Sequence, residues 1–171
     1  MKNMSRLARA AARSDRRALT RLVGAVQGDV WRLCAHMTDP VSANNLARDA
    51  YLHALPGLKR LRRDVSVRTW LLTVAYRICQ EEAGSRNRAM PTADRPAVLG
   101  STGGQQAEAA LPLAALEPAP RGAFVLTQPL GCSYEEATEI SGCPASVIRA
   151  RVARARDDLG RLIAAGASAV S

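Results

Sequence analysis

The sequence has few aromatic residues and almost no lysine. Aromatic side chains make up 4% of its 171 residues and apolar ones 47%, so a core built from this chain must be mainly aliphatic. Lysine occurs only at Lys2 and Lys59, and the formal net charge of +9 is therefore carried almost entirely by arginine. Such an excess favours a polyanionic partner, and composition alone leaves open whether that partner is nucleic acid or a membrane surface.

The chain also lacks the patterns of a zinc site, a secretory signal and a membrane span. Its four cysteines have no C-x-x-C spacing, and the two histidines, His36 and His53, lie near only one of them, Cys34. We therefore expect no metal, no cofactor and reduced, buried thiols. The basic amino-terminal stretch has no apolar h-region, and no run of about 18 apolar residues occurs, so a cytoplasmic protein is expected.

No segment alternates apolar and polar residues as a half-buried strand does, which predicts an all-α fold. Helical segments are expected at about 15–26, 29–37, 41–54, 66–83, 111–116 and 122–130. The stretch at 84–110 is rich in Gly, Pro, Ser, Thr and Gln and has no apolar periodicity. We therefore predict two small helical domains, 1–83 and 111–163, joined by a flexible linker at 84–110 and followed by a flexible tail at 164–171.

The clearest motif is GCSYEEATEISGCPASVIRARVARARDDL, near the carboxyl end. Ser133 and Glu136 have the spacing of a capping box, which predicts a helix from Tyr134 to Ser141 with Tyr134, Ala137 and Ile140 facing inward. Gly142 suits the residue after a helix, and Pro144 suits the first position of the next one. A helix-turn-helix is predicted, whose second helix enters the major groove of DNA.

The second helix of this motif has two different faces. A stripe at helical spacing predicts its core side: Ile148, Val152, Ala155, Leu159 and Leu162. The opposite face carries small residues flanked by Arg149, Arg151 and Arg154, which permits close approach to an anionic groove. Arginine there can bind phosphates or guanine. A merely solvated helix is the alternative, and Asp157 and Asp158 fit it at the far end.

Two segments carry a family resemblance. SVRTWLLTVAYRIC and the carboxyl-terminal motif resemble the extracytoplasmic-function (ECF, group IV) sigma factors of bacterial RNA polymerase, and the likeness extends from about Asp15 to Leu162 except for the linker. Many response regulators share the bare helix-turn-helix, but they lack the Arg-Thr-Trp-Leu-Leu segment. The resemblance implies a transcription initiation factor that is not an enzyme. It also implies RNA polymerase core and promoter DNA as partners, and often an anti-sigma factor.

The resemblance also implies three sets of site residues. The second domain would read the −35 element as duplex, through Ser133, Ser146, Val147, Arg149, Ala150, Arg151 and Arg154. The first domain would open and read the −10 element, through Lys59, Arg60, Arg62, Arg63, Ser66, Arg68 and Arg77. A third set would dock on the clamp helices of the β′ subunit: Asn44, Asn45, Leu46, Asp49 and Leu52. The second domain would dock on the β flap.

In this interpretation the basic loop at 56–66 would bind the phosphates of the opened strand, because a single strand is held mainly through its phosphates. An ordinary solvated loop is the alternative.

Several positions depart from the family pattern, and two other functions stay open. Asn44 and Asn45 stand where the family usually has an acidic pair, and Arg77 stands in place of a common asparagine. The first alternative is a stand-alone regulator whose amino-terminal domain senses a ligand or dimerises, which the two asparagines favour. The second is an enzyme acting on nucleic acid, but the sequence shows no paired-carboxylate, Cys-His or nucleotide-loop motif for it.

Overall fold

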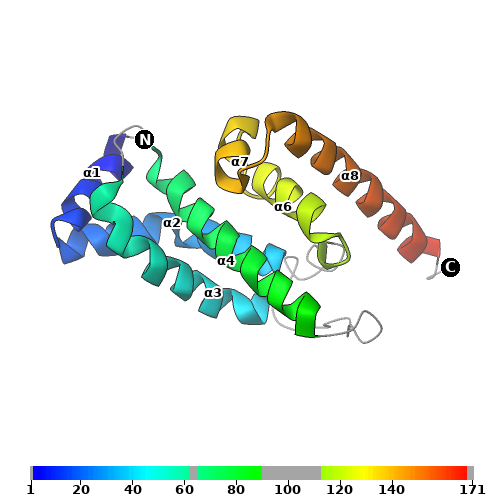
Figure 1. Ribbon diagram of the computed structural model, residues 1–171, viewed down its shortest axis with the longest axis horizontal. Helices are drawn as coiled ribbons and strands as arrows, with labels where there is room; N and C mark the ends of the chain where they lie inside the picture. The colour runs from blue at the N-terminus through cyan, green and yellow to red at the C-terminus, as the bar shows by residue number, and fades with distance from the viewer. Residues whose placement is uncertain (1, 62–64, 90–112, 169–171) are drawn as a thin grey trace.

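The computed structural model describes residues 2–61, 65–89 and 113–168. Within these ranges the chain is helical and has no strand, which confirms the all-α prediction. The elements are α1 (Lys2–Ala12), α2 (Arg16–Met37), α3 (Pro40–Ala54), the 3-10 helix η1 (Leu55–Arg60), α4 (Val67–Ala89), α6 (Pro118–Thr127), α7 (Tyr134–Ser141) and α8 (Ala145–Ser168) (Figure 1).

Local signals start the amino-terminal helices as the sequence suggests. The Asp15 carboxylate accepts a hydrogen bond from the Ala18 N–H at 3.1 Å, and α2 follows. The Asp39 carboxylate accepts from the Ser42 N–H at 2.8 Å, and α3 begins with Pro40. Each aspartate satisfies an N–H that the helix itself leaves unpaired.

Three helices run further than predicted. α2 continues through Gly28, where a break was expected, because buried neighbours such as Val26 and Val30 outweigh the cost of about 1 kcal/mol for one helical glycine. α4 continues to Ala89 and so includes the first part of the predicted linker. α8 continues to Ser168, into the predicted tail. The rest of the predicted linker, 90–110, lies outside the described residues.

The helices α2, α3 and α4 pack around an aliphatic core, as the scarcity of aromatic residues requires. Its largest fully buried side chains include Leu22, Leu33, Leu71 and Leu72. α1 closes one end of this unit, with Ala8 buried against it. No helix in the described part of the chain is both long and apolar enough to span a bilayer.

The carboxyl-terminal helices α6, α7 and α8 pack against this unit rather than apart from it (Figure 1). Val125, Leu126 and Ile140 belong to the same buried cluster as residues of α2 and α4. Gly122 permits the close approach of α6 to α4, because a Cβ at this position would lie 2.5 Å from the Tyr76 hydroxyl oxygen. The division into domains 1–83 and 111–163 stays a prediction.

A buried arginine joins the two groups of helices. Arg121, on α6, is 6% exposed, and its guanidinium donates to the Met37 carbonyl at the end of α2 at 3.0 Å. It also donates to the carbonyls of Ala114 and Leu116 at 2.7 and 2.6 Å. One side chain therefore pairs backbone carbonyls from two distant parts of the sequence.

Candidate nucleic-acid and polymerase interfaces

The predicted helix-turn-helix is present as α7, a turn and α8. The Ser133 hydroxyl accepts from the Glu136 N–H at 3.1 Å, while the Glu136 carboxylate accepts from the Ser133 N–H at 2.9 Å, so both bonds of the capping box form. Gly142 ends α7 with a φ of 69°, the left-handed conformation that glycine adopts without strain. Pro144 precedes α8 by one residue instead of opening it, and its carbonyl accepts from the Ile148 N–H.

The first half of α8 presents the predicted recognition face to solvent. Ser146, Val147, Arg149 and Ala150 are exposed. Behind them, Ile148, Val152 and Ala155 are buried as predicted, but Leu159 is only half-buried and Leu162 is 40% exposed. The predicted core stripe was therefore wrong at its far end, because α8 extends beyond the helices that cover its beginning.

Tyr134 was predicted to face inward, and this was wrong. It is the first residue of α7, is 37% exposed, and its ring centroid lies 5.5 Å from the Arg149 Cζ atom. That distance is within the range of a cation–π interaction, which orients the guanidinium on the recognition face. The signal in the sequence was the phenol hydroxyl, because a tyrosine at a helix start can keep its polar end in water.

Two of the predicted DNA-contacting arginines of α8 have protein partners. Arg154 is 60% exposed and pairs with Glu117 at 3.1 Å. Arg151 is half-buried and donates to the Cys143 sulfur at 3.0 Å. Arg151 lies toward α4, near the Tyr76 hydroxyl. Burial raises the pKa of that hydroxyl, whereas a hydrogen bond with Gln80 and the charge of Arg151 act to lower it. In this arrangement Arg149 is more open to DNA than Arg151.

Arg68, a predicted −10 residue, links the two groups of helices. Its Nε donates to the Asp29 carboxylate of α2 at 2.6 Å, and one Nη donates to the Leu130 carbonyl at 2.7 Å. The other Nη contacts the Cys132 sulfur at 3.6 Å. Burial acts against the charge of Arg68, but the bond to Asp29 and the interactions with Cys132 outweigh it and raise its pKa. Sequence reasoning did not foresee these partners.

The other predicted −10 residues have different surroundings. Lys59 and Arg60 are exposed on η1, and Arg77 is exposed on α4, 3.8 Å from Glu81. Ser66 instead starts α4, since its carbonyl accepts from the Trp70 N–H at 2.9 Å and its hydroxyl from the Thr69 N–H at 3.4 Å. Arg62 and Arg63 lie outside the described residues.

The predicted docking residues on α3 do not all face outward. Asn44, Asn45 and Leu52 are exposed, with Leu52 at 60%, and Asp49 is partly exposed. Leu46 is 8% exposed and belongs to the core, so little of its side chain is left for contact with a docking partner. It lies on the side of α3 that packs against the neighbouring helices.

A groove between α2 and α3 adds aromatic residues that the sequence reasoning missed. Its volume is about 470 Å³, and Trp31, Asn44, Arg48 and Tyr51 help to line it. The Trp31 indole N–H donates to the Asn44 side-chain carbonyl at 3.0 Å. The Tyr51 hydroxyl is buried without a hydrogen-bond partner among the described residues. Its pKa is raised to about 12, mainly by burial and then by the charges of Cys34 and Asp29.

Comparison with known proteins decides the family. No family model matches the chain. The chain is 39% identical, over 163 residues, to the ECF RNA polymerase sigma factor SigC of Mycobacterium tuberculosis, and the match covers 90% of this chain and 87% of that protein. The chain belongs to the ECF RNA polymerase sigma factors. This sigma factor directs RNA polymerase to promoters, and the stand-alone regulator is not favoured.

Two solved structures resemble this sigma factor in fold. CnrH, in complex with the cytosolic domain of CnrY, is 22% identical with a TM-score of 0.74, and the match covers 95% of this chain and 98% of CnrH. RpoE of Bartonella quintana, in complex with the anti-sigma factor NepR, is 23% identical with a TM-score of 0.70, and the match covers 85% of this chain and 96% of RpoE. At these identities the likeness shows the all-α fold alone.

Proposed function

We propose that this sigma factor reads the −35 element with the first half of α8 and holds the opened −10 element with η1 and α4. The exposed face of Ser146, Val147, Arg149 and Ala150 supports the first assignment, because small residues allow close approach and arginine can bind guanine or phosphate. The uncovered cations Lys59 and Arg60 support the second. The protein would act at the nucleoid in the cytoplasm, without a cofactor or an activity as an enzyme.

The arrangement of Arg68 supports a change of conformation before DNA binding. Its guanidinium is hydrogen-bonded to the Leu130 carbonyl, so it can contact the −10 strand only after the carboxyl-terminal helices have moved away.

The two promoter elements lie about one and a half duplex turns apart, roughly 50 Å at about 34 to 36 Å per turn. A chain as long as the segment 90–112 spans up to about 80 Å when extended, which is sufficient. RNA polymerase would hold the separated units at this distance.

An anti-sigma factor is a further proposed partner. The fold resembles CnrH and RpoE, whose solved structures contain CnrY and the anti-sigma factor NepR, respectively. Exposed apolar side chains at Val41 and Leu52 of α3 and at Ile163 of α8 give such a partner apolar surface to cover.

The −35 assignment predicts a large loss of transcription for Arg149→Ala. One good base or phosphate contact contributes about 1 to 3 kcal/mol, so run-off transcription with core polymerase should fall roughly 5- to 150-fold. Arg161→Ala is the matched control, because Arg161 lies on the same helix, is exposed and pairs with Asp158, three residues before it. Equal output from the two variants would remove α8 from the DNA interface.

The docking assignment predicts tighter binding for Asn44→Glu combined with Asn45→Asp. Each added surface ion pair is expected to contribute about 0.2 to 1 kcal/mol, and binding to core polymerase should become more salt-dependent. A glutamate at position 44 can still accept the hydrogen bond from Trp31. The control is Gln80→Glu with Ser85→Asp, which adds the same charge at exposed positions of α4. The measurement is the binding constant for core polymerase at several salt concentrations. If the two double variants bind equally well at every salt concentration, the docking surface is contradicted.

A further inference from the structure

Two of the four free cysteines meet in the core between α2 and α4. Cys34 of α2 and Cys79 of α4 are each 0% exposed and belong to the buried cluster that these helices share. Their thiols are hydrogen-bonded to each other. Cys132 and Cys143 differ from this pair, because the sulfur of each accepts from an arginine. The core of the amino-terminal unit therefore contains a dithiol.

The hydrogen bond makes the two sulfurs of this dithiol unequal. It is the main cause of the lowered pKa of Cys34, and burial opposes it. The same bond, followed by burial, raises the pKa of Cys79. Cys34 is therefore the thiol that more readily becomes a thiolate, the reactive form of cysteine, while Cys79 keeps its proton. A sensor cysteine and its resolving cysteine need such a nucleophilic sulfur beside a protonated one.

The groove between α2 and α3 leads toward this dithiol. Tyr51 lines the groove, and the pKa of its hydroxyl is raised mainly by burial and then by the charge of Cys34. That hydroxyl is buried and has no hydrogen-bond partner among the described residues. A buried polar group without a partner is costly, so a small polar molecule that bonds to it is favoured there. The groove, of about 470 Å³, is large enough to admit one.

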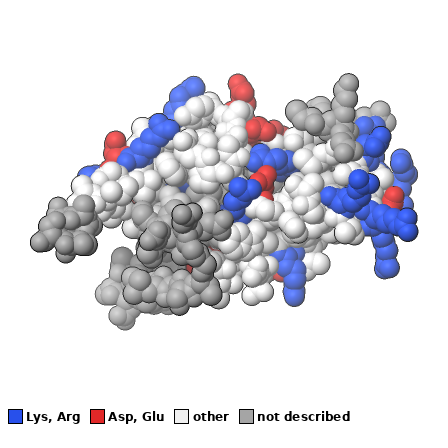
Figure 2. Space-filling view, turned by 180° about the vertical axis from the view of Figure 1, so that it is seen from behind, with Lys and Arg blue, Asp and Glu red and all other residues white. Residues whose placement is uncertain are grey.

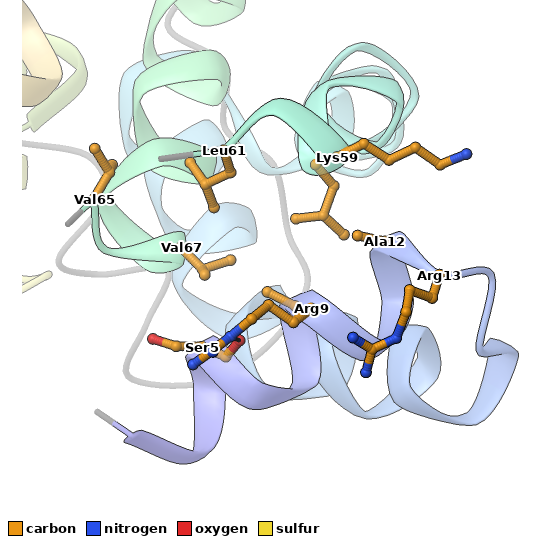
Figure 3. Close-up of a pocket in the computed structure, with 10 residues that line it drawn as sticks. Ser5, Arg9, Ala12, Arg13, Lys59, Leu61, Val65 and Val67 are labelled. Atoms are coloured by element: carbon orange, nitrogen blue, oxygen red, sulfur yellow. Dashed lines mark hydrogen bonds between the residues drawn. The ribbon is translucent and has the colours of Figure 1, made fainter. Parts of the chain in front are cut away.

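A second pocket, of about 220 Å³, lies between α1 and the segment that runs from η1 into α4 (Figure 3). No cysteine is among the described residues that line it, and Arg9, Arg13 and Lys59 lie on its rim. Figure 2 shows that Lys and Arg side chains gather over the end of the molecule formed by α1 and the start of α2. An anionic oxidant would be drawn to these cations rather than to the groove, so the groove suits an uncharged oxidant.

We propose that Cys34 and Cys79 form a disulfide when hydrogen peroxide enters from the groove past Tyr51. The Cys34 sulfur attacks one peroxide oxygen, so that an S–O bond forms, the O–O bond breaks, and the departing hydroxide takes up a proton and leaves as water. The Cys79 sulfur then attacks the Cys34 sulfur, so that an S–S bond forms, the S–O bond breaks, and the hydroxyl leaves as water with the Cys79 proton. Both sulfurs are oxidised, and the peroxide is reduced to water. The bridge joins α2 to α4, and it does not depend on the proposed function.

The first test identifies the bridge in the folded, full-length protein. After treatment with hydrogen peroxide, peptide mapping by mass spectrometry should recover the Cys34 and Cys79 peptides as one species that dithiothreitol separates. The melting temperature should rise by roughly 4 to 16 °C, because the bridge restricts the unfolded chain. Cys34→Ala and Cys79→Ala should abolish this rise. The matched control, Cys132→Ala, replaces another buried cysteine and should keep it.

Three results of the first test would overturn the proposal. The first is an absence of the bridge in peroxide-treated wild type. The second is a bridge that forms only in urea, since the native packing would then not bring the sulfurs together. The third is oxidation of Cys34 to sulfinic acid without a bond to Cys79.

The second test narrows the groove. Gly28 lines it, and a Cβ there would meet only the Arg32 side chain within 4 Å, at an ordinary contact distance of 3.7 Å. Gly28→Leu should therefore leave the fold intact and slow formation of the bridge several-fold. Gly24→Leu is the matched control, because Gly24 is an exposed glycine of the same helix that does not line the groove. Equal rates for these two variants would contradict entry through the groove.

The third test removes the unpaired hydroxyl. Tyr51→Phe should slow formation of the bridge about two- to tenfold, which is the contribution of one hydrogen bond. Its melting temperature before oxidation should not fall, because the hydroxyl has no partner among the described residues to lose. A rate equal to that of the wild type would show that peroxide does not pass Tyr51, and the proposed route would fail.

Discussion

Arg121→Met is expected to lower the free energy of unfolding by about 3 to 5 kcal/mol. The change removes three hydrogen bonds: those to the Met37 and Leu116 carbonyls are buried, and the one to the Ala114 carbonyl is partly buried. An unpaired buried polar group costs about 1 to 3 kcal/mol. Methionine can fill most of the space of the arginine stem, so the loss of the donors is the main effect. Thermal unfolding followed by circular dichroism should shift down by roughly 6 to 20 °C.

The matched control for this change is Arg156→Met on α8. Arg156 is exposed, and its guanidinium donates to the Gln128 side chain at 3.1 Å. Surface changes of this kind usually stay within about 0.5 kcal/mol. Arg121→Lys provides a second comparison. The single ammonium group of lysine can reach some of the three carbonyls, so the loss of unfolding free energy should be intermediate. Equal melting temperatures for Arg121→Met and Arg156→Met would show that the buried arginine does not hold α6 to the end of α2.

Gly122→Val is expected to push α6 away from α4. A Cβ at this position meets the Tyr76 hydroxyl oxygen at 2.5 Å and its ring carbons at 2.9 and 3.1 Å, and Tyr76 is only 3% exposed. Overpacking of this kind typically costs about 1 to 3 kcal/mol. The carboxyl-terminal helices should therefore separate from α2 and α4 more often. Small-angle scattering should then report a larger radius of gyration.

The same variant should change DNA binding through Arg68. Separation breaks the bond from Arg68 to the Leu130 carbonyl and frees the guanidinium for DNA, so the affinity for a single-stranded −10 oligonucleotide should rise. Tyr76→Ala in the same chain removes the clash and should restore part of the compact form, a coupling that a double-mutant cycle measures. Gly160→Val is the control, because nothing lies within 4 Å of a Cβ there. A radius of gyration for Gly122→Val equal to that of Gly160→Val would contradict the predicted separation.

The residues of the helix-turn-helix show how far sequence reasoning reached. Ser133, Glu136 and Gly142 specified the limits of α7, because a capping box and a left-handed glycine act over three or four residues of one segment. The buried stripe of Ile148, Val152 and Ala155 also followed from spacing alone. The all-α fold followed from the absence of an alternating pattern, and the sigma-factor family from the resemblance of two segments to its members. Each of these signals can be found without knowing which segments contact one another.

Contacts between distant segments were decided by the tertiary structure. The burial of Leu46, the exposure of Tyr134 and the pocket beside Arg9 depend on which helix covers which face. Arg68 looked like a DNA contact from its place in the chain, but it pairs with Asp29 and with the carbonyl of Leu130, 62 residues away. The sequence determined most of the helices and the cationic residues that are candidates for contacting DNA. Only the packing of α6 and α7 on α2 and α4 decided which of those residues are open to it, because burial depends on contacts that local periodicity does not encode.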